Sequence, residues 1–307
     1  MRRSQPPADA GADPAVRPVG SLTQRPLAAR NPRIARLARL ARQRSARASE
    51  RAFVVEGPKL VGEALDAAWP LEAVFVETVG LARPAVAQVL GRCTEAGLPV
   101  WQVVAGALAR AADTSTSQGI VAVAGWPGPL TDVGADDRAD PEDDEPALVL
   151  LAHDINDPGN AGTLVRAADA AGATQVILTG RSVDPTNPKA VRAAAGALFH
   201  LPVHPEADLE AVLADLGARG VQRLATVVDG GVPYDEVDLT GPTALVLGSE
   251  AHGLPEWVSA AVDQPVTIPM RGRAESLNVA MAGAVVCFEA ERQRRVRRAG
   301  ATGPSGR

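Results

Sequence analysis

The sequence contains few aromatic residues and only two cysteines. Aromatic side chains make up 3% of the 307 residues, so aliphatic side chains must form most of the core, and we expect no aromatic platform that stacks nucleic-acid bases. Cys93 and Cys287 are too few for a disulfide framework or for a zinc site with four cysteine ligands. We therefore expect a protein of a reducing compartment, the cytoplasm, with no metal site.

Long apolar runs and several common fingerprints are also absent. The sequence has no run of about 18 apolar residues, so we expect no membrane span, and its N-terminus lacks the apolar centre of a secretory signal. It also lacks GxGxxG, GxxxxGK followed by Ser or Thr, and GxSxG. Their absence argues against a dehydrogenase on an ordinary doubly wound fold, a P-loop enzyme and a hydrolase with a nucleophile elbow.

The net charge of −5 conceals two basic segments and one acidic segment. Nine arginines and one acid lie between Arg25 and Arg51, and six arginines and one acid lie from Glu291 to Arg307. Residues 132–145 hold eight acids and one arginine. In the first basic segment, four arginines recur every three residues with aliphatic residues between them, which predicts a basic amphipathic helix. We expect these four to bind RNA phosphates, with a solvated helix face as the alternative: Arg33, Arg36, Arg39 and Arg42.

The remaining pattern predicts an α/β protein with two domains. Hydrophobic residues make up 46% of the chain and charged residues 22%, which is enough to bury a sizeable core. Short apolar strands alternate with helical segments from about residue 48 to 125 and again from residue 147 onward. The apolar run that begins at Ala147 is typical of a parallel strand covered on both faces. We predict a disordered extension (1–30), a small α/β domain (31–126), an acidic linker (127–146), a mainly parallel α/β domain (147–297) and a disordered basic tail (298–307).

Three segments place glycine, proline or polar residues directly after an apolar strand. They span residues 156–166, 245–255 and 268–280. In open α/β sheets, ligands bind at the carboxyl edge, where such segments lie. We therefore expect the three segments to converge on a single pocket.

Residues in the first two segments have a functional and an ordinary interpretation. Asn160 is predicted to cap the helix that follows it, and Arg166 lies in that helix near the cap, either as a site residue or as a surface arginine. Gly248 ends a buried strand and permits close approach of a ligand. Glu250 follows it, either as a site residue or as a loop acid.

The third segment leads into a helix predicted over residues 275–295. Ser276 is either a site residue or the N-cap of this helix. Asn278 lies one turn into the predicted helix, where asparagine is unfavourable. Ala280, Gly283 and other small residues follow, which predicts a deeply packed helix or a dimer contact.

Together the three segments resemble the motifs of the SpoU/TrmH family of RNA 2′-O-ribose methyltransferases, in the SPOUT superfamily. The family's motifs are N-x-G-x-x-x-R, G-S/A-E-x-x-G-L/M, and I-P-M followed by S-L-N-V. The resemblance covers residues 147–295, and residues 31–125 look like the family's substrate-binding domain. The matching residues are Asn160, Gly162 and Arg166 in the first motif, Gly248, Ser249, Glu250, Gly253 and Leu254 in the second, and Ile268, Pro269, Met270, Ser276, Leu277, Asn278 and Val279 in the third.

The resemblance implies a SPOUT fold, in which the C-terminal segment forms a deep trefoil knot. It implies a homodimer, which agrees with the small residues of the C-terminal helix. It also implies that S-adenosylmethionine binds in the knot, with further contacts from the loop near Val227. By this resemblance, the backbone that holds the cofactor lies around Leu247, Gly248, Gly253, Ile268, Met270 and Leu277.

The implied reaction is methyl transfer to a ribose 2′-hydroxyl of structured RNA. Arg166 would bind the adjacent phosphate and stabilise the developing alkoxide, because a guanidinium stays protonated unless its pKa is lowered a great deal. Asn160, Glu250, Ser276 and Asn278 would orient Arg166 and the ribose. The separate N-terminal domain favours 23S ribosomal RNA, and the alternatives are a tRNA 2′-O-methyltransferase and a non-catalytic RNA-binding protein.

Overall fold

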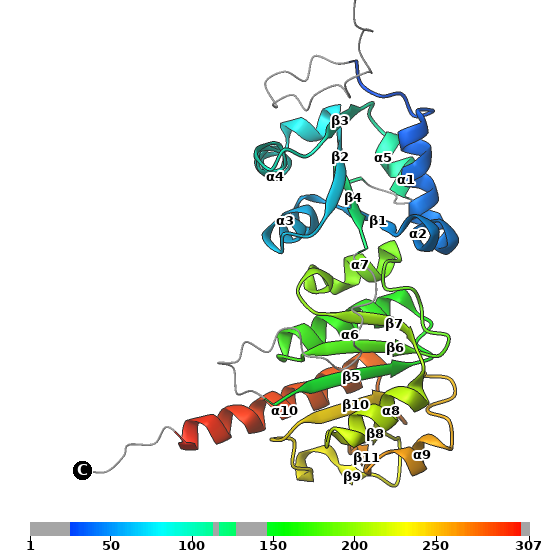
Figure 1. The fold of residues 1–307 in the computed structure, drawn as a ribbon, viewed down its shortest axis with the longest axis vertical. Coiled ribbons are helices and arrows are strands. Elements are labelled where there is room, and N and C mark those ends of the chain that lie inside the picture. The colour runs from blue at the N-terminus through cyan, green and yellow to red at the C-terminus, as the bar shows by residue number, and fades with distance from the viewer. Residues whose placement is uncertain (1–24, 113–116, 127–145, 302–307) are drawn as a thin grey trace, which may run out of the picture.

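The computed structural model describes residues 25–112, 117–126 and 146–301 as two α/β units stacked along the long axis of the molecule (Figure 1). The predictions made for residues 1–24, 127–145 and 302–307 lie outside these described residues. They concern most of the N-terminal extension, the acidic linker and the end of the basic tail.

The N-terminal unit is a four-stranded sheet with helices on both faces. Its strand order is β1-β4-β2-β3, in which β4 runs antiparallel to β1 and β2, while β2 and β3 are parallel. Ile34, Leu37 and Leu40 are buried against Val54 and Val121, which confirms the amphipathic helix predicted there. The elements are α1 (Pro32–Arg42), α2 (Arg44–Glu50), β1 (Ala52–Glu56), α3 (Pro58–Asp66), β2 (Leu71–Glu77), η2 (Thr78–Ala82), α4 (Pro84–Glu95), β3 (Val100–Val103), α5 (Ala107–Ala112) and β4 (Ile120–Gly125).

The second unit is built on a seven-stranded sheet with the order β7-β6-β5-β10-β8-β11-β9. Every neighbouring pair in it is parallel, which confirms the predicted mainly parallel sheet. Because the strands are parallel, their carboxyl ends lie at one edge. The elements are β5 (Leu148–His153), α6 (Pro158–Ala170), β6 (Gln175–Thr179), α7 (Pro188–Ala194), η3 (Ala197–Phe199), β7 (Val203–Ala207), α8 (Leu209–Ala218), β8 (Gln222–Thr226), β9 (Val232–Pro233), η4 (Tyr234–Glu236), β10 (Thr243–Leu247), α9 (Val258–Ala261), β11 (Gln264–Thr267) and α10 (Val279–Ala301).

Helices α6 and α10 pack closely because α10 has a glycine where the two helices meet. A Cβ added to Gly283 of α10 would lie 2.6 Å from Cδ2 of Leu164 on α6, and 2.9 Å from Cδ1 of Leu247 on β10. The small residues predicted in this helix therefore bring α10 against both α6 and the sheet. None of the helices in the described residues, α10 included, is long and apolar enough to cross a membrane. The trefoil knot stays a prediction.

Several boundaries differ from the sequence-based expectation. Helix α10 begins at Val279 rather than at residue 275, and it continues to Ala301 into the segment expected to be a disordered tail. Residues 25–30 were assigned to the disordered extension, but Leu27 forms a β-bridge with Val103. Its amide donates to the carbonyl of Gln102 at 2.8 Å, so this part of the extension adds to the edge of the N-terminal sheet.

The two units share an interface with both aromatic and charged contacts. The ring of Phe199 lies 6.5 Å from that of Phe53, stacked, and 5.3 Å from that of Trp69, edge to face. Beside them, Arg47 of α2 donates to Asp184 of the second unit at 2.8 Å, and the Arg47 side chain is 4% exposed. This ion pair therefore joins α2 to the loop after β6 at a covered position between the two units.

Candidate active site

A pocket of about 160 Å³ opens at the carboxyl edge of the seven-stranded sheet. It lies beyond the ends of β8, β10 and β11 and against the inner face of α10. All six residues predicted around the cofactor line it: Leu247, Gly248, Gly253, Ile268, Met270 and Leu277. The structure thus brings together residues that are up to 30 positions apart in the sequence, from 247 to 277, while their role in binding a cofactor stays a prediction.

The loop after β10 has its shape because two of its residues are glycines. Ser249 and Gly253 form a small β-bridge, with N–O distances of 3.2 and 2.8 Å in the two directions. Gly253 has a φ of +66°, a left-handed conformation that favours glycine. A Cβ on Gly248 would lie 2.6 Å from the amide nitrogen of Leu254. The backbone of this loop therefore folds back tightly and forms one wall of the pocket.

Three polar side chains from the three predicted segments meet beside this pocket. The Nδ2 group of Asn160 donates to Oε1 of Glu250 at 3.0 Å, and Nδ2 of Asn278 donates to the same oxygen at 2.6 Å. Asn278 also donates to Oδ1 of Asn160 at 3.0 Å, and the amide of Val279 donates to Glu250 at 3.3 Å. We call Asn160, Glu250 and Asn278 the polar cluster. One carboxylate oxygen thus links the segments that follow β5, β10 and β11 in the chain.

The helix caps explain how two amides are available to this cluster. Asn160 was predicted to cap α6, but Asp157 does so, because its Oδ1 accepts from the amide of Asn160 at 2.9 Å. The Asn160 side chain is therefore available for Glu250. Asn278 was predicted to lie inside the last helix, but its Oδ1 accepts from the amides of Ala280 and Met281, at 3.0 and 3.3 Å, so it is the N-cap of α10.

Ser276 and Arg166 occupy different places with respect to the polar cluster. Ser276 lies in the loop before α10 and lines the pocket, so it is not the helix cap. Arg166 is exposed on α6, about 9 Å along the helix axis from Asn160 and on a different face, because six residues complete about one and two-thirds turns. Among the described residues its guanidinium has no hydrogen bond or ion pair. A single chain thus does not bring Arg166 to the cluster.

The four arginines predicted to bind RNA lie on α1, and each already has a partner in the N-terminal unit. A guanidinium has five N–H donors, so these contacts neither require nor exclude a phosphate, and RNA binding by the four arginines stays a prediction. The partners are Glu50 and Glu72 for Arg36, at 2.6 and 2.7 Å, Glu50 for Arg39, at 2.8 Å, the carbonyl of Arg110 for Arg42, at 2.7 Å, and the ring of Trp101 for Arg33, at 4.1 Å from the centroid.

Some pocket residues were not singled out from the sequence. Ala282 and Val286 of α10 line the pocket together with the motif residue Val279, and their helical spacing from it is the signal that identifies an inward face. Glu275 adds a second carboxylate to the lining. In the part of the chain that the structure describes, no three His, Cys, Asp or Glu residues are grouped so that they could hold a metal ion.

Comparisons with known proteins agree with this geometry. Residues 147–288 match the SpoU rRNA Methylase family, and residues 31–122 match the MRM3-like substrate binding domain. The 23S rRNA (guanosine(2553)-2′-O)-methyltransferase RlmP of Bacillus subtilis is 31% identical over 242 residues, which cover 79% of this chain and 89% of that protein.

Solved structures of similar proteins extend the likeness to the whole fold. An AdoMet-bound rRNA methyltransferase from Sinorhizobium meliloti is 32% identical with a TM-score of 0.73, covering 85% of this chain and 95% of that one. The SpoU methyltransferase AviRb from Streptomyces viridochromogenes, in complex with AdoMet, is 28% identical with a TM-score of 0.75, covering 87% and 100%. Since both the sequence and both α/β units agree with these proteins over most of their length, the chain belongs to the SpoU/TrmH family of RNA methyltransferases.

Proposed function

We propose that the protein transfers a methyl group from S-adenosylmethionine to a ribose 2′-hydroxyl of 23S ribosomal RNA. The observation that supports this most directly is the polar cluster of Asn160, Glu250 and Asn278, held together by hydrogen bonds beside the pocket of the carboxyl edge. Such a cluster fixes polar groups next to a cavity that is lined by both apolar and polar residues. This is the usual arrangement of a small-molecule site.

The pocket residues fit S-adenosylmethionine. Val266, Ile268 and Val286 supply apolar wall for a purine base, and the folded loop at Gly248 leaves backbone exposed to a ligand. Glu275, at the pocket lining, supplies negative charge for the cationic parts of the molecule. When bound, S-adenosylmethionine supplies a methyl group on a sulfonium, an activated leaving group that needs no further activation by the protein.

The protein's own residues then have to position the ribose and stabilise the charge on its oxygen. Glu250 and the two asparagines orient the ribose, and Ser276 adds a hydroxyl to the lining of the same pocket. We assign Arg166 to the adjacent phosphate and to the alkoxide that develops as the 2′-hydroxyl loses its proton. A guanidinium suits this role because it keeps its positive charge throughout.

We propose that Arg166 reaches the cluster of a second copy of the chain. Met281 and Phe288 on α10 are 61% and 49% exposed and lie one after the other on one helix face, since seven residues make two turns. An apolar stripe of this kind on a helix suits a symmetric contact. Arg166 projects from α6, which packs against α10, so a dimer formed through α10 places Arg166 near the partner's pocket.

A purified heterodimer tests this arrangement. One chain carries Arg166→Ala and the other Asn278→Ala, and each homodimer is expected to keep about a tenth of the wild-type activity or less. If Arg166 serves the partner's site, one of the two sites is intact, and the heterodimer keeps about half of the wild-type activity. An inactive heterodimer would place Arg166 in its own chain's site, and wild-type turnover by Arg166→Ala homodimers would remove it from the reaction.

The choice of ribosomal RNA is supported by the second domain. The N-terminal unit matches a substrate binding domain, and the relative RlmP is named for a 23S rRNA nucleotide. The test is to map ribose methylation across total RNA of the source organism with and without the gene. We expect one 23S ribose methylation to disappear and to return when the gene is restored. Loss of a tRNA methylation would favour a tRNA enzyme, and an unchanged map would favour a non-catalytic RNA-binding protein.

A further inference from the structure

The polar cluster depends on the turn that connects β5 to α6. Asn160 enters the cluster from the first turn of α6, and only four residues, 154–157, separate β5 from that helix. The direction in which this turn leaves the sheet therefore determines where the Asn160 side chain lies relative to Glu250. Asp154 is the first residue of the turn, and it is not among the residues that line the pocket.

Asp154 has a backbone conformation that few residue types adopt readily. Its φ is +55°, in the left-handed region, where glycine, asparagine and aspartate are tolerated best. Its carbonyl accepts from Nδ2 of Asn156 at 3.1 Å, which adds a hydrogen bond within the turn. Because a left-handed residue bends the chain sharply, Asp154 sets the path from β5 to α6.

The Asp154 side chain joins this turn to the neighbouring loop after β6. Its Oδ1 accepts from the backbone amide of Arg181 at 2.6 Å. Its Oδ2 lies 3.7 Å from Nε2 of His153, which is too far for a hydrogen bond. The contact with Arg181 depends on Gly180, because a Cβ added there would collide with Oδ1 of Asp154. The side chain of one loop is thus bound to the main chain of the next.

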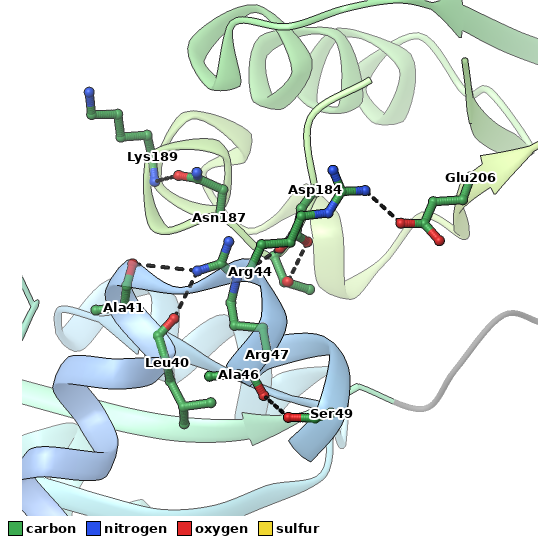
Figure 2. Close-up of polar contacts among 11 residues, drawn as sticks. Leu40, Ala41, Arg44, Ala46, Arg47, Ser49, Asp184, Asn187, Lys189 and Glu206 are labelled. Carbon is green, nitrogen blue, oxygen red and sulfur yellow. Dashed lines mark hydrogen bonds and ion pairs between the residues drawn. The ribbon is translucent and has the colours of Figure 1, made fainter. Parts of the chain in front are cut away.

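The loop after β6 is itself anchored on two sides. Ser182 of this loop is 6% exposed, and its hydroxyl accepts from the amide of Ile155 at 3.1 Å. Arg47 of the N-terminal unit donates to Asp184 of the same loop at 2.8 Å (Figure 2). Asp154 therefore ties the turn before α6 to a loop that has contacts with both units.

We propose that Asp154 is a positioning residue for methyl transfer, because it holds the turn before α6 so that Asn160 stays within hydrogen-bond distance of Glu250. This inference rests on the proposed function. Asp154 affects kcat, since Asn160 belongs to the part of the site that orients the ribose. It does not affect the affinity for S-adenosylmethionine, because the residues that line the pocket all lie between positions 226 and 286.

The test compares variants of Asp154 in the full chain by initial rates of methyl transfer to unmodified 23S ribosomal RNA at saturating S-adenosylmethionine. Asp154→Ala removes the acceptor and disfavours the left-handed turn, so kcat should fall about tenfold or more. Asp154→Gly keeps the turn but lacks the acceptor, and its kcat should fall as far. Asp154→Asn keeps both and should retain nearly the wild-type kcat. The dissociation constant of S-adenosylmethionine, measured by calorimetry, should be unchanged in all of them.

A double-mutant cycle shows whether Asp154 acts through Asn160. Asn160→Ala alone should lower kcat about tenfold, because it removes a positioned polar contact. If Asp154 serves to hold Asn160, Asp154→Ala makes no further difference in that background, and the two effects do not add. Additive effects would overturn the inference, since a general loss of stability lowers the rate whether or not Asn160 is present.

Two glycines provide a matched pair of substitutions that leaves Asp154 in place. Gly180 and Gly220 have φ of +63° and +74°, so alanine causes backbone strain at both. A Cβ on Gly180 collides with the Asp154 carboxylate and with the ring of His153, whereas a Cβ on Gly220, in the loop before β8, has open space. Gly180→Ala should therefore lower kcat as Asp154→Ala does, and Gly220→Ala should keep the wild-type kcat.

Three further results would overturn the inference. They are a wild-type kcat in Asp154→Ala, a kcat as low in Asp154→Asn as in Asp154→Ala, and equal losses in Gly180→Ala and Gly220→Ala. Thermal unfolding shows whether each variant is folded at the assay temperature, and the glycine pair and Asp154→Asn still decide the matter if Asp154→Ala does not fold. The proposed function fails in a different way, by absence of methyl transfer from the wild-type protein itself.

Discussion

Substitution of Asn278 separates a structural role from a role at the active site. Its Oδ1 accepts from the amides of Ala280 and Met281, which starts α10. Its Nδ2 donates to Glu250 at 2.6 Å and to Asn160 at 3.0 Å, which holds the polar cluster. The oxygen of this amide group thus starts the helix, while its nitrogen holds the polar cluster. One substitution can remove both atoms, and another can remove only the nitrogen.

Asn278→Ala removes both ends. Loss of an N-cap costs about 1 kcal/mol, and loss of the hydrogen bonds to an exposed carboxylate costs about 1–2 kcal/mol more. At about 2–4 °C of Tm for each kcal/mol in a unit of this size, we expect Tm to fall by about 5–10 °C. Methyl transfer should fall at least tenfold, as expected when a positioned polar contact is lost.

Asn278→Asp keeps the acceptor that starts the helix and replaces the donor with a second carboxylate oxygen. Repulsion from Glu250 in this exposed place costs about 1 kcal/mol, so Tm should fall by only about 2–4 °C. Methyl transfer should nevertheless fall as far as in Asn278→Ala, because the cluster has lost its donor. The assay pairs thermal unfolding with initial rates of methyl transfer to 23S RNA. Activity that follows Tm across the three proteins, with the aspartate variant nearly fully active, would refute the reasoning.

Three further predictions concern the pocket loop, the thiols and acid stability. Gly248→Ala should weaken S-adenosylmethionine binding at least tenfold by calorimetry, because its Cβ meets the opposite strand of the loop, while Gly272→Ala has open space and should bind normally. Burial raises the pKa of Cys93 to about 11 and that of Cys287 to about 12, so neither thiol should react with Ellman's reagent at about pH 8 until the protein is unfolded. Hydrogen bonds from the arginines of α1 hold the pKa of Glu50 below its usual 4.5, so this carboxylate stabilises the fold above that pH and the stabilisation is lost as pH falls below it. Glu50→Gln should therefore lose less Tm than wild type between about pH 6 and pH 3.5, and an equal loss would contradict this.

The sequence predicts the layered architecture well, because the spacing of the apolar residues and the turn residues between them mark most strands. It fails at the two edges of the large sheet, where β7 contains Pro205 and β9 contains Pro233. Proline argues against a central strand, but an edge strand tolerates it, since one row of its backbone groups has no ladder partner. Whether a short strand lies at an edge depends on the order of the strands, which the local sequence does not contain.

The active site was predictable as a meeting of three segments, but not in its detailed contacts. Asp157 and Asn160 are both good helix caps, as are Ser276 and Asn278, so local preference does not decide between them. The structure assigns the caps to Asp157 and Asn278, and this choice directs Asn160 toward Glu250.

The most direct test of the central claim is to identify the product formed by the purified protein. Unmodified 23S ribosomal RNA is incubated with the wild-type chain and S-adenosylmethionine, digested to nucleosides and analysed by mass spectrometry. We predict one 2′-O-methylated nucleoside, formed by the wild type and lost in Asn278→Asp. Methylation on a base rather than on the ribose, or an equal yield from Asn278→Asp, would contradict the account.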